Sequence, residues 1–195
     1  MVVSRGAIAL GFIAGILLCA QPADRAYRPA RTVQAVRATA VADAAAVHIM
    51  RYNKDMPIGR ACELYRTISR AVHDMSAGDK SGVVSNITPE LCLALILVES
   101  GARNSTSAKG AVGMAQVMPL HIESLKAAGI LRKGSVSELR ETENNIRAGV
   151  YILMGYARTA RSVESALARY NAGVKGESRG YRYAKKVLAL YREII

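Results

Sequence analysis

The sequence predicts an all-α protein built around one buried helix. The run from residue 89 to residue 99 is apolar on nearly every face, which is typical of a helix enclosed by other helices. Stripes of apolar residues at helical spacing recur on both sides of this run, and no segment shows a convincing strand-like alternation. The chain has 195 residues, of which 51% are hydrophobic, so it is long enough for one domain with extensions.

The first 20 residues have the composition of a signal peptide or a membrane anchor. One basic residue, Arg5, precedes an apolar run over 7–20. This run suits the hydrophobic region of a cleaved signal and is shorter than the roughly 20 residues of a membrane span. The alternatives are a retained anchor and a lipoprotein, although Leu18 before Cys19 is bulky for a lipidation motif. Each alternative places the rest of the chain outside the cytoplasm, and we expect the periplasm.

Residues 21–56 are predicted to form a linker followed by an alanine-rich helix. Prolines and arginines indicate a linker over 21–31, and helical spacing indicates a helix over 32–51. This helix either packs on the main domain or forms a partly disordered spacer. Its apolar positions are Val33, Val36, Ala40, Val47 and Met50. The pair Met56-Pro57 ends the segment, so residues 57–195 are predicted to form the main domain.

The helix predicted over 58–75 has an apolar stripe that should face the core. The stripe consists of Ile58, Cys62, Tyr65, Ile68, Val72 and Met75. A loop rich in glycine and serine follows over 76–86 and separates this helix from the buried one.

The buried helix has clear start and stop signals. Thr88 can cap its first turn, Pro89 suits the first helical position, and Glu90 complements the helix dipole. The helix should end at Glu99 or Ser100, because Gly101 suits a C-cap. Four further helices are predicted over 119–128, 143–160, 163–170 and 181–195.

The charge balance favours an anionic partner or surface. Lys and Arg outnumber Asp and Glu by 27 to 15, which gives a formal net charge of +12. Nucleic acid, phospholipid and a cell-envelope polymer all satisfy that balance. The basic residues are scattered along the sequence and no nucleic-acid-binding motif is present, so nucleic acid is not a predicted partner.

Two cysteines remain beyond the N-terminal segment, Cys62 and Cys92. In an oxidising compartment they could form a disulfide. The alternative is two small buried core residues, because free cysteine is often buried. Their spacing indicates no metal site, and no cofactor is predicted.

Glu99 is the one feature that burial alone does not require. It stands in the last turn of the apolar helix, between Val98 and a polar loop rich in Gly, Ser and Asn. Poor solvation disfavours the charged form of a carboxyl group and raises its pKa, which suits a general acid. The alternative is an ordinary, partly exposed glutamate at a helix end.

Four blocks of residues follow one another in the order and spacing of a known family. The blocks are Glu99-Ser100-Gly101; Ser107 with Gly110-Ala111, Gly113-Met114-Ala115-Gln116 and Val117-Met118-Pro119; Asn145-Ile146 with Gly149 and Tyr151-Ile152-Leu153; and Ala166-Leu167-Ala168-Arg169-Tyr170-Asn171-Ala172-Gly173. With them, the segment from about residue 88 to residue 191 resembles the catalytic domain of the soluble lytic transglycosylase family, a helical relative of goose-type lysozyme.

The resemblance implies a lysozyme-like fold with a saccharide-binding groove beside the central helix. It also implies cleavage of the β-1,4 bond between N-acetylmuramic acid (MurNAc) and N-acetylglucosamine (GlcNAc) in peptidoglycan. Glu99 would act first as acid and then as base, and the product would be 1,6-anhydro-MurNAc. No second catalytic carboxylate is implied, because the acetamido group of the substrate is thought to stabilise the sugar cation.

The same resemblance implies a set of substrate-binding residues. They are Ser100, Ser107, Gln116, Met118, Asn145 and Tyr170. Tyr170 could orient the acetamido group or the acid, and Met118 could offer an apolar surface to a sugar. Each has a structural alternative: Tyr170 and Met118 could be core residues, Gln116 could stabilise its loop, and Ser100 and Asn145 could brace the loops around Glu99.

The chain departs from the family pattern near its end. Relatives often carry a Glu four residues before the Tyr of a late Tyr-Val block. The corresponding stretch here is Arg179-Gly180-Tyr181-Arg182-Tyr183-Ala184, so that acid is absent and contacts in some sugar subsites should differ. Glu177 lies two residues earlier and is not expected to replace it. His121 could lie near the groove or on a surface helix.

Two other functions remain open at this point. A goose-type lysozyme would use the same fold and acid but hydrolyse the bond with water. An inactive peptidoglycan-binding module of an envelope-spanning machine would have lost catalysis, although the four blocks are intact. A specialised enzyme could also serve a secretion, conjugation or phage machine, and contact with a membrane is expected only through the N-terminal segment.

Overall fold

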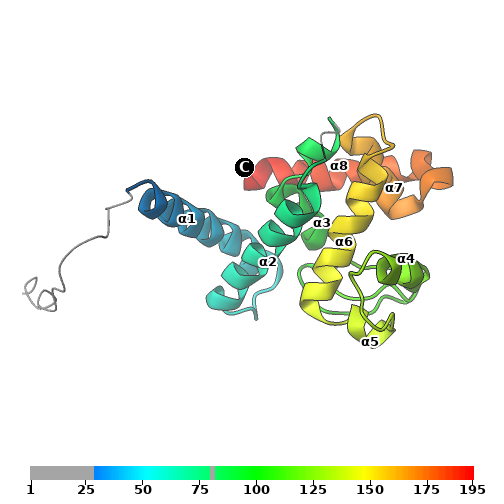
Figure 1. The fold of residues 1–195 in the computed structure, drawn as a ribbon, viewed down its shortest axis with the longest axis horizontal. Coiled ribbons are helices and arrows are strands. Elements are labelled where there is room, and N and C mark those ends of the chain that lie inside the picture. Colours follow the sequence, from blue (N-terminus) through cyan, green and yellow to red (C-terminus); the bar gives the residue numbers. More distant parts are fainter. Residues whose placement is uncertain (1–28, 80–81) are drawn as a thin grey trace, which may run out of the picture.

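The computed structural model of the protein describes residues 29–79 and 82–195, with side chains described from residue 40 onward. The predicted targeting segment and most of the predicted linker, residues 1–28, lie outside the described residues. Within the described part, the regular structure is helical apart from two isolated β-bridges, Thr106–Val112 and Val112–Val117. The all-α prediction is therefore confirmed (Figure 1).

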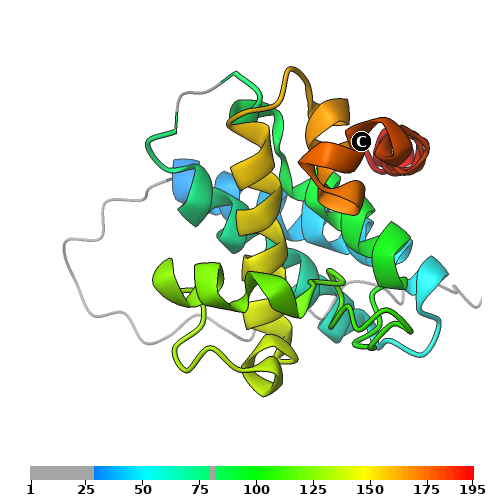
Figure 2. The same ribbon diagram turned by 90° about the vertical axis from the view of Figure 1, so that its right-hand side faces the viewer.

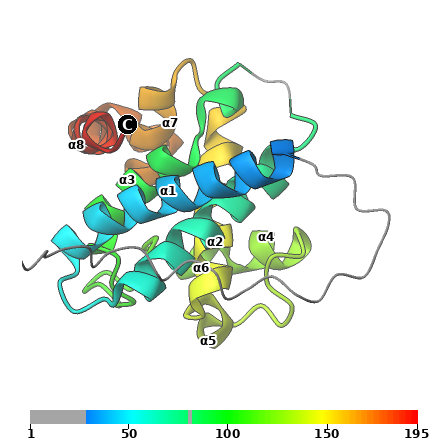
Figure 3. The ribbon, with the colours of Figure 1, turned by 90° about the vertical axis from the view of Figure 1, so that its left-hand side faces the viewer.

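Helix α1 (Pro29–Tyr52) begins three residues earlier than predicted and packs along α2 (Figure 3). The buried side chains of α1 are Ala42, Ala45, Ala46 and Ile49, whereas Val47 is exposed. Of the apolar positions named for this helix, Ala40 and Val47 are exposed and Met50 is half-buried against the core, so small alanines together with Ile49 supply most of the contact. Of the two alternatives for this segment, packing on the domain is the one observed for its C-terminal half.

Helices α2 (Ile58–Ser76) and α3 (Pro89–Ser100) follow the predicted boundaries closely. The first residue of α2, Ile58, is exposed and the rest of its apolar stripe is buried or half-buried. The side chain of Thr88 accepts a hydrogen bond of 3.2 Å from the Leu91 amide, which is the predicted cap. Between the two helices, a short 3₁₀ turn, η1 (Val84–Asn86), interrupts the loop.

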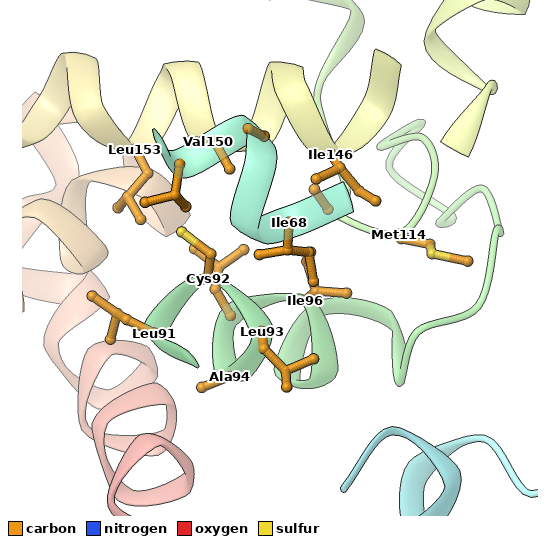
Figure 4. Close-up of a cluster of buried hydrophobic side chains, with 14 of the residues drawn as sticks. Ile68, Leu91, Cys92, Leu93, Ala94, Ile96, Met114, Ile146, Val150 and Leu153 are labelled. Atoms are coloured by element: carbon orange, nitrogen blue, oxygen red, sulfur yellow. The ribbon is translucent and has the colours of Figure 1, made fainter. Parts of the chain in front are cut away.

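Helix α3 is the centre of the molecule (Figure 2). Every residue from Leu91 to Leu97 is buried, which confirms the prediction of a central buried helix. Helices α1, α2 and α8 all contact α3. Figure 4 shows the side chain of Cys92 pointing toward Val150 and Leu153 of α6 (Thr142–Ala157).

A loop follows α3, and three short helical elements then lead from this loop to α6. They are η2 (Pro119–His121), α4 (Ile122–Ala127) and α5 (Val136–Leu139). Helix α5 was not predicted, because four residues carry no periodic pattern. The Glu138 carboxylate closes the turn before α5 by accepting hydrogen bonds of 2.8, 2.8 and 3.0 Å from three successive backbone amides, at residues 132–134.

The last helices form a tight antiparallel pair, α7 (Val163–Ala172) and α8 (Glu177–Ile194), joined by η3 (Val174–Gly176). Helix α8 begins four residues earlier than predicted. A Cβ at Gly180 would overlap the Ala168 carbonyl of α7, so only glycine permits this approach of the two backbones. The pairing brings residues of α8 back against α3 (Figure 1).

The two cysteines are both buried and unbridged. The Cys62 thiol donates to an oxygen of Asp43 at 3.4 Å, while Cys92 lies in the core between α3 and α6. Of the two alternatives, the structure therefore shows two separate buried core cysteines and no disulfide between them. Across the described helices, none combines the length and apolar character needed to cross a membrane.

Candidate active site

Glu99 lies in the last turn of α3, where the chain leaves the core. The apolar body of the helix ends just before it, and its side chain is half-buried. Gly101 then reverses the chain with a left-handed φ of 60°, and its amide bonds the Leu97 carbonyl at 2.9 Å. The carboxyl group therefore stands at the border between the buried helix and the loop that follows.

The hydroxyl of Tyr183 donates a hydrogen bond of 2.6 Å to Oε1 of Glu99. Tyr183 belongs to α8 and lies 84 residues away along the chain. The sequence analysis did not name Tyr183 as a site residue. The signal that could have found it is its position in Tyr183-Ala184, the pair that corresponds to the family's late Tyr-Val block.

Burial raises the pKa of the Glu99 carboxyl above its ordinary value, and the hydrogen bond from Tyr183 acts in the opposite direction. Burial is the larger effect, so the predicted direction is confirmed. The pKa of Tyr183 is raised well above its ordinary value by burial and by the nearby Glu99 charge. Tyr183 is therefore a neutral donor, and Glu99 is a carboxyl group that holds its proton more readily than an exposed one.

Tyr170 lies near the acid but does not donate to it. Its hydroxyl donates at 2.7 Å to the backbone carbonyl of Ala115, in the loop after α3. Burial and the Glu99 charge raise the pKa of Tyr170 well above its ordinary value. The structure thus gives this predicted residue a role in holding the loop, while Tyr183 occupies the position from which the acid is oriented.

Two other predicted residues brace the same loop. The Ser100 hydroxyl donates to the Met114 carbonyl at 2.7 Å. Asn145 is completely buried and bonds three backbone groups: its amide donates to Val112 and Leu139 carbonyls at 2.8 and 3.0 Å, and its carbonyl accepts from Ala115 at 2.8 Å. These contacts favour the bracing alternative for both residues.

Several residues of this loop have a positive φ, among them Gly113 and Gln116. Gly113 has a φ of 78°, and a Cβ there would overlap the Asn145 amide. Gln116 has a φ of 49°, an uncommon conformation for a residue with a side chain. The side-chain amide nitrogen of Gln116 donates to the carbonyls of Gly113 and Ser105 at 2.8 and 3.2 Å, which stabilises the loop as the structural alternative predicted.

The remaining predicted residues lie around this loop. Ser107 closes a turn by accepting a 3.0 Å bond from the Ala111 amide. Met118, just before η2, and His121, its last residue, are both half-buried, and burial lowers the pKa of His121 below its ordinary value. Leu120 between them has 74% of its surface exposed.

The departure from the family pattern is visible in α8. Arg179 stands one turn before Tyr183 and is exposed. The Glu177 carboxylate is engaged elsewhere: it bonds Ser165, Arg169 and Tyr181 at 2.7, 2.6 and 2.8 Å. These bonds lower the pKa of Glu177 to about 2 and fix the start of α8 against α7. Glu177 therefore does not take the place of the missing acid.

The arrangement can deliver and recover one proton. Among the described residues, the groups that shift the pKa of Glu99 include no second carboxyl group. Its Oε1 is held by Tyr183, which leaves Oε2 to exchange a proton with a substrate. The fold and site thus define an all-α domain in which a half-buried acid, held by a tyrosine hydroxyl, stands at the end of the central helix.

Comparison with known families identifies the chain more closely. The model of the family described as "Transglycosylase SLT domain" matches residues 78–189, which is more than half of the chain, so the protein belongs to this family. The matched segment begins before α3 and includes both Glu99 and Tyr183.

Individual relatives agree with this family. The chain is 34% identical over 89 residues to the endo-type membrane-bound lytic murein transglycosylase A of two Klebsiella pneumoniae strains, which covers 44% of this chain and 44% of each relative. It is 27% identical over 128 residues to a peptidoglycan-binding-like protein of Escherichia coli O157:H7, covering 60% of this chain and 76% of that protein. The chain thus spans less than half the length of the transglycosylases that it matches.

Proposed function

We propose that the protein is a peptidoglycan lytic transglycosylase that acts outside the cytoplasm. The observation that carries the proposal is the pairing of the half-buried Glu99 with the Tyr183 hydroxyl, within a domain of the transglycosylase SLT family. The name of the Klebsiella relatives, a membrane-bound lytic murein transglycosylase, supports both the murein substrate and action at the cell envelope. The predicted N-terminal targeting segment is consistent with periplasmic action.

The proposed reaction uses Glu99 twice. The protonated carboxyl gives its proton to the glycosidic oxygen as the bond between C1 of MurNAc and that oxygen breaks. The carboxylate left behind then takes the proton of the MurNAc 6-hydroxyl as its oxygen bonds C1. One bond to C1 replaces another, the proton returns to Glu99, and no water is consumed.

Tyr183 supports both halves of this cycle. Its hydroxyl holds Oε1 in place, and it stabilises the carboxylate between the two proton transfers. In the proposed reaction the substrate's acetamido group stabilises the sugar cation, since no second carboxyl group acts on Glu99 in the described residues. The braced loop over 101–118, including Met118 at its end, would border the bound glycan.

The test is the substitution Glu99→Gln with purified sacculi as substrate. Glutamine keeps the shape but cannot donate and recover a proton, so we expect the rate to fall roughly a hundred- to ten-thousand-fold. The control is Glu123→Gln on α4, an exposed carboxyl group that should leave the rate unchanged. A Glu99→Gln protein that clears sacculi at the wild-type rate would remove Glu99 as the catalyst.

Mass spectrometry of the released fragments distinguishes the alternatives. Anhydro ends, lighter than hydrolysed ends by one water, would establish the lyase. Reducing ends would establish a lysozyme with the same acid, and binding without fragments would establish an inactive peptidoglycan-binding module.

A further inference from the structure

Basic residues that are scattered along the sequence gather on one face of α8. Between residues 174 and 195 the chain has six Lys or Arg and only two Glu, and one of those acids, Glu177, is already bonded to Arg169. The exposed cations of this helix, called here the α8 basic face, are Arg179, Arg182, Lys185, Lys186 and Arg192. Within the described residues none of these five forms an ion pair or a side-chain hydrogen bond.

One edge of this face borders the candidate active site. Arg179 and Lys186 lie four residues before and three residues after Tyr183, so they are its neighbours on the helix surface. Arg182 stands between them, three residues after Arg179 and four before Lys186. The three cations form a row about 10 Å long on the helix whose Tyr183 reaches Glu99.

We propose that the row Arg179, Arg182 and Lys186 binds the carboxylates of the peptide stems carried by the MurNAc residues of the substrate. This inference rests on the proposed function. A glycan bound at Glu99 would lie close to α8, because Tyr183 of this helix contacts the acid, and the peptide stems of such a glycan carry free carboxylates beside the sugar backbone. Guanidinium and ammonium groups without internal partners are suited to such anions.

The composition of the face favours a hydrated polyanion over a membrane. Helices that lie in a membrane interface present large apolar residues beside their cations. Apart from the cations, the exposed residues of α8 are Ser178, Ala189 and Glu193, whereas Val187 and Leu190 are buried in the core. The face therefore offers charge without an inserting apolar surface.

The test compares two triple variants that lose equal charge. In the first, Arg179, Arg182 and Lys186 are changed to Gln. In the control, Arg132, Lys133 and Arg140 are changed to Gln; these exposed residues flank α5, which lies at the opposite end of the molecule from α8 (Figure 1). Thermal unfolding of both variants establishes that each retains its fold.

The substrates are glycan strands that carry stems with free carboxylates, and the same strands with those carboxylates amidated. For the α8 variant we expect KM to rise roughly tenfold on the free-carboxylate strands, because exposed ion pairs contribute little singly and three are removed. Its kcat should stay within about twofold, and its KM on amidated strands should equal that of the wild type. Added salt should weaken wild-type binding to the free-carboxylate strands only.

Three results would overturn the proposal. Equal changes in KM for both triple variants would mean that net charge alone matters. An equal loss on amidated strands would mean that carboxylates are not recognised. Unchanged KM with lost binding to phosphatidylglycerol vesicles would assign the face to a membrane.

The inference and the proposed function fail in different ways. If the wild type releases no fragments from any strand, the proposed function fails. Equilibrium binding of the same two kinds of strand then measures the carboxylate preference without any cleavage, and binding that is indifferent to amidation overturns the inference by itself.

Discussion

The substitution Tyr183→Phe isolates the hydrogen bond to the acid. It removes one oxygen atom and keeps the ring, which packs against the buried core. The bond that disappears is 2.6 Å long, within the range of charge-assisted O–H···O bonds. Nothing else in the described residues bonds the Tyr183 hydroxyl, so the change is confined to Glu99.

The expected size of the effect follows from the charge on the acceptor. A hydrogen bond to a charged group contributes about 1.5–3 kcal/mol, and in the proposed reaction it stabilises the Glu99 carboxylate that forms as the glycosidic bond breaks. Since about 1.4 kcal/mol corresponds to a factor of ten in rate, kcat should fall roughly ten- to a hundred-fold where bond cleavage limits turnover. KM should change little, because the hydroxyl contacts the acid and not the sugar.

The pH profile gives a second readout with a definite sign. The Tyr183 hydrogen bond lowers the pKa of Glu99 against the larger raising effect of burial. Its loss therefore raises that pKa further, and Glu99 keeps its proton to higher pH. Because the alkaline limb of the kcat profile reports the protonated acid, this limb should move to higher pH in Tyr183→Phe.

The assay is release of anhydro fragments from sacculi, measured from acid to alkaline pH. The control is Tyr181→Phe, on the same helix, whose hydroxyl donates to Glu177 at 2.8 Å instead. A Tyr183→Phe enzyme with wild-type kcat and an unmoved alkaline limb would refute the reasoning. So would equal effects of the two tyrosine substitutions.

Three further predictions concern stability and the cysteines. Gly113→Ala should lower the free energy of unfolding in urea by about 1–3 kcal/mol, which is more than the loss in Gly110→Ala. Both glycines have a positive φ, but only at Gly113 would the added Cβ overlap a buried side-chain amide, that of Asn145. Equal losses in the two variants would contradict this explanation. Glu177→Gln should lower the melting temperature at pH 7. The difference in melting temperature from the wild type should shrink as pH falls from 4.5 to about 2, because the stabilisation by the Glu177 carboxylate is lost when it is protonated. A difference that does not vary with pH would be inconsistent with this prediction. Alkylation after denaturation, without reductant, should modify both Cys62 and Cys92, and protection of the pair would show a disulfide.

Local signals account for what the sequence predicted well. The cap at Thr88, the glycine after Ser100 and the continuous apolar run set α3 to within a residue, and they place Glu99 in its last turn. These features act within one or two turns of a helix, so neighbours along the chain are enough to recognise them. The acid and its raised pKa could therefore be predicted before any tertiary structure was known.

Tertiary contacts account for what was missed. The alanine-rich sequence of α1 does not define which face packs, because alanine fits either side of a helix. Glycine is a weak helix former, which argued against a helix through Gly180. Helix α8 nevertheless continues through this position, and glycine is required there because α7 lies too close for a side chain. The partnership of Tyr183 with Glu99 joins positions 84 residues apart, and no local pattern specifies it.

The distance along the chain between Glu99 and Tyr183 has a consequence for the timing of activity. A ribosome makes α3 well before α8, which emerges only after the loop region, α6 and α7 have been synthesised. Until then the acid lacks the hydroxyl that orients it and one of the helices that bury it. A nascent or shortened chain that lacks α8 therefore contains Glu99 without its hydrogen-bond partner, and the proposed activity would arise only after α8 has been made.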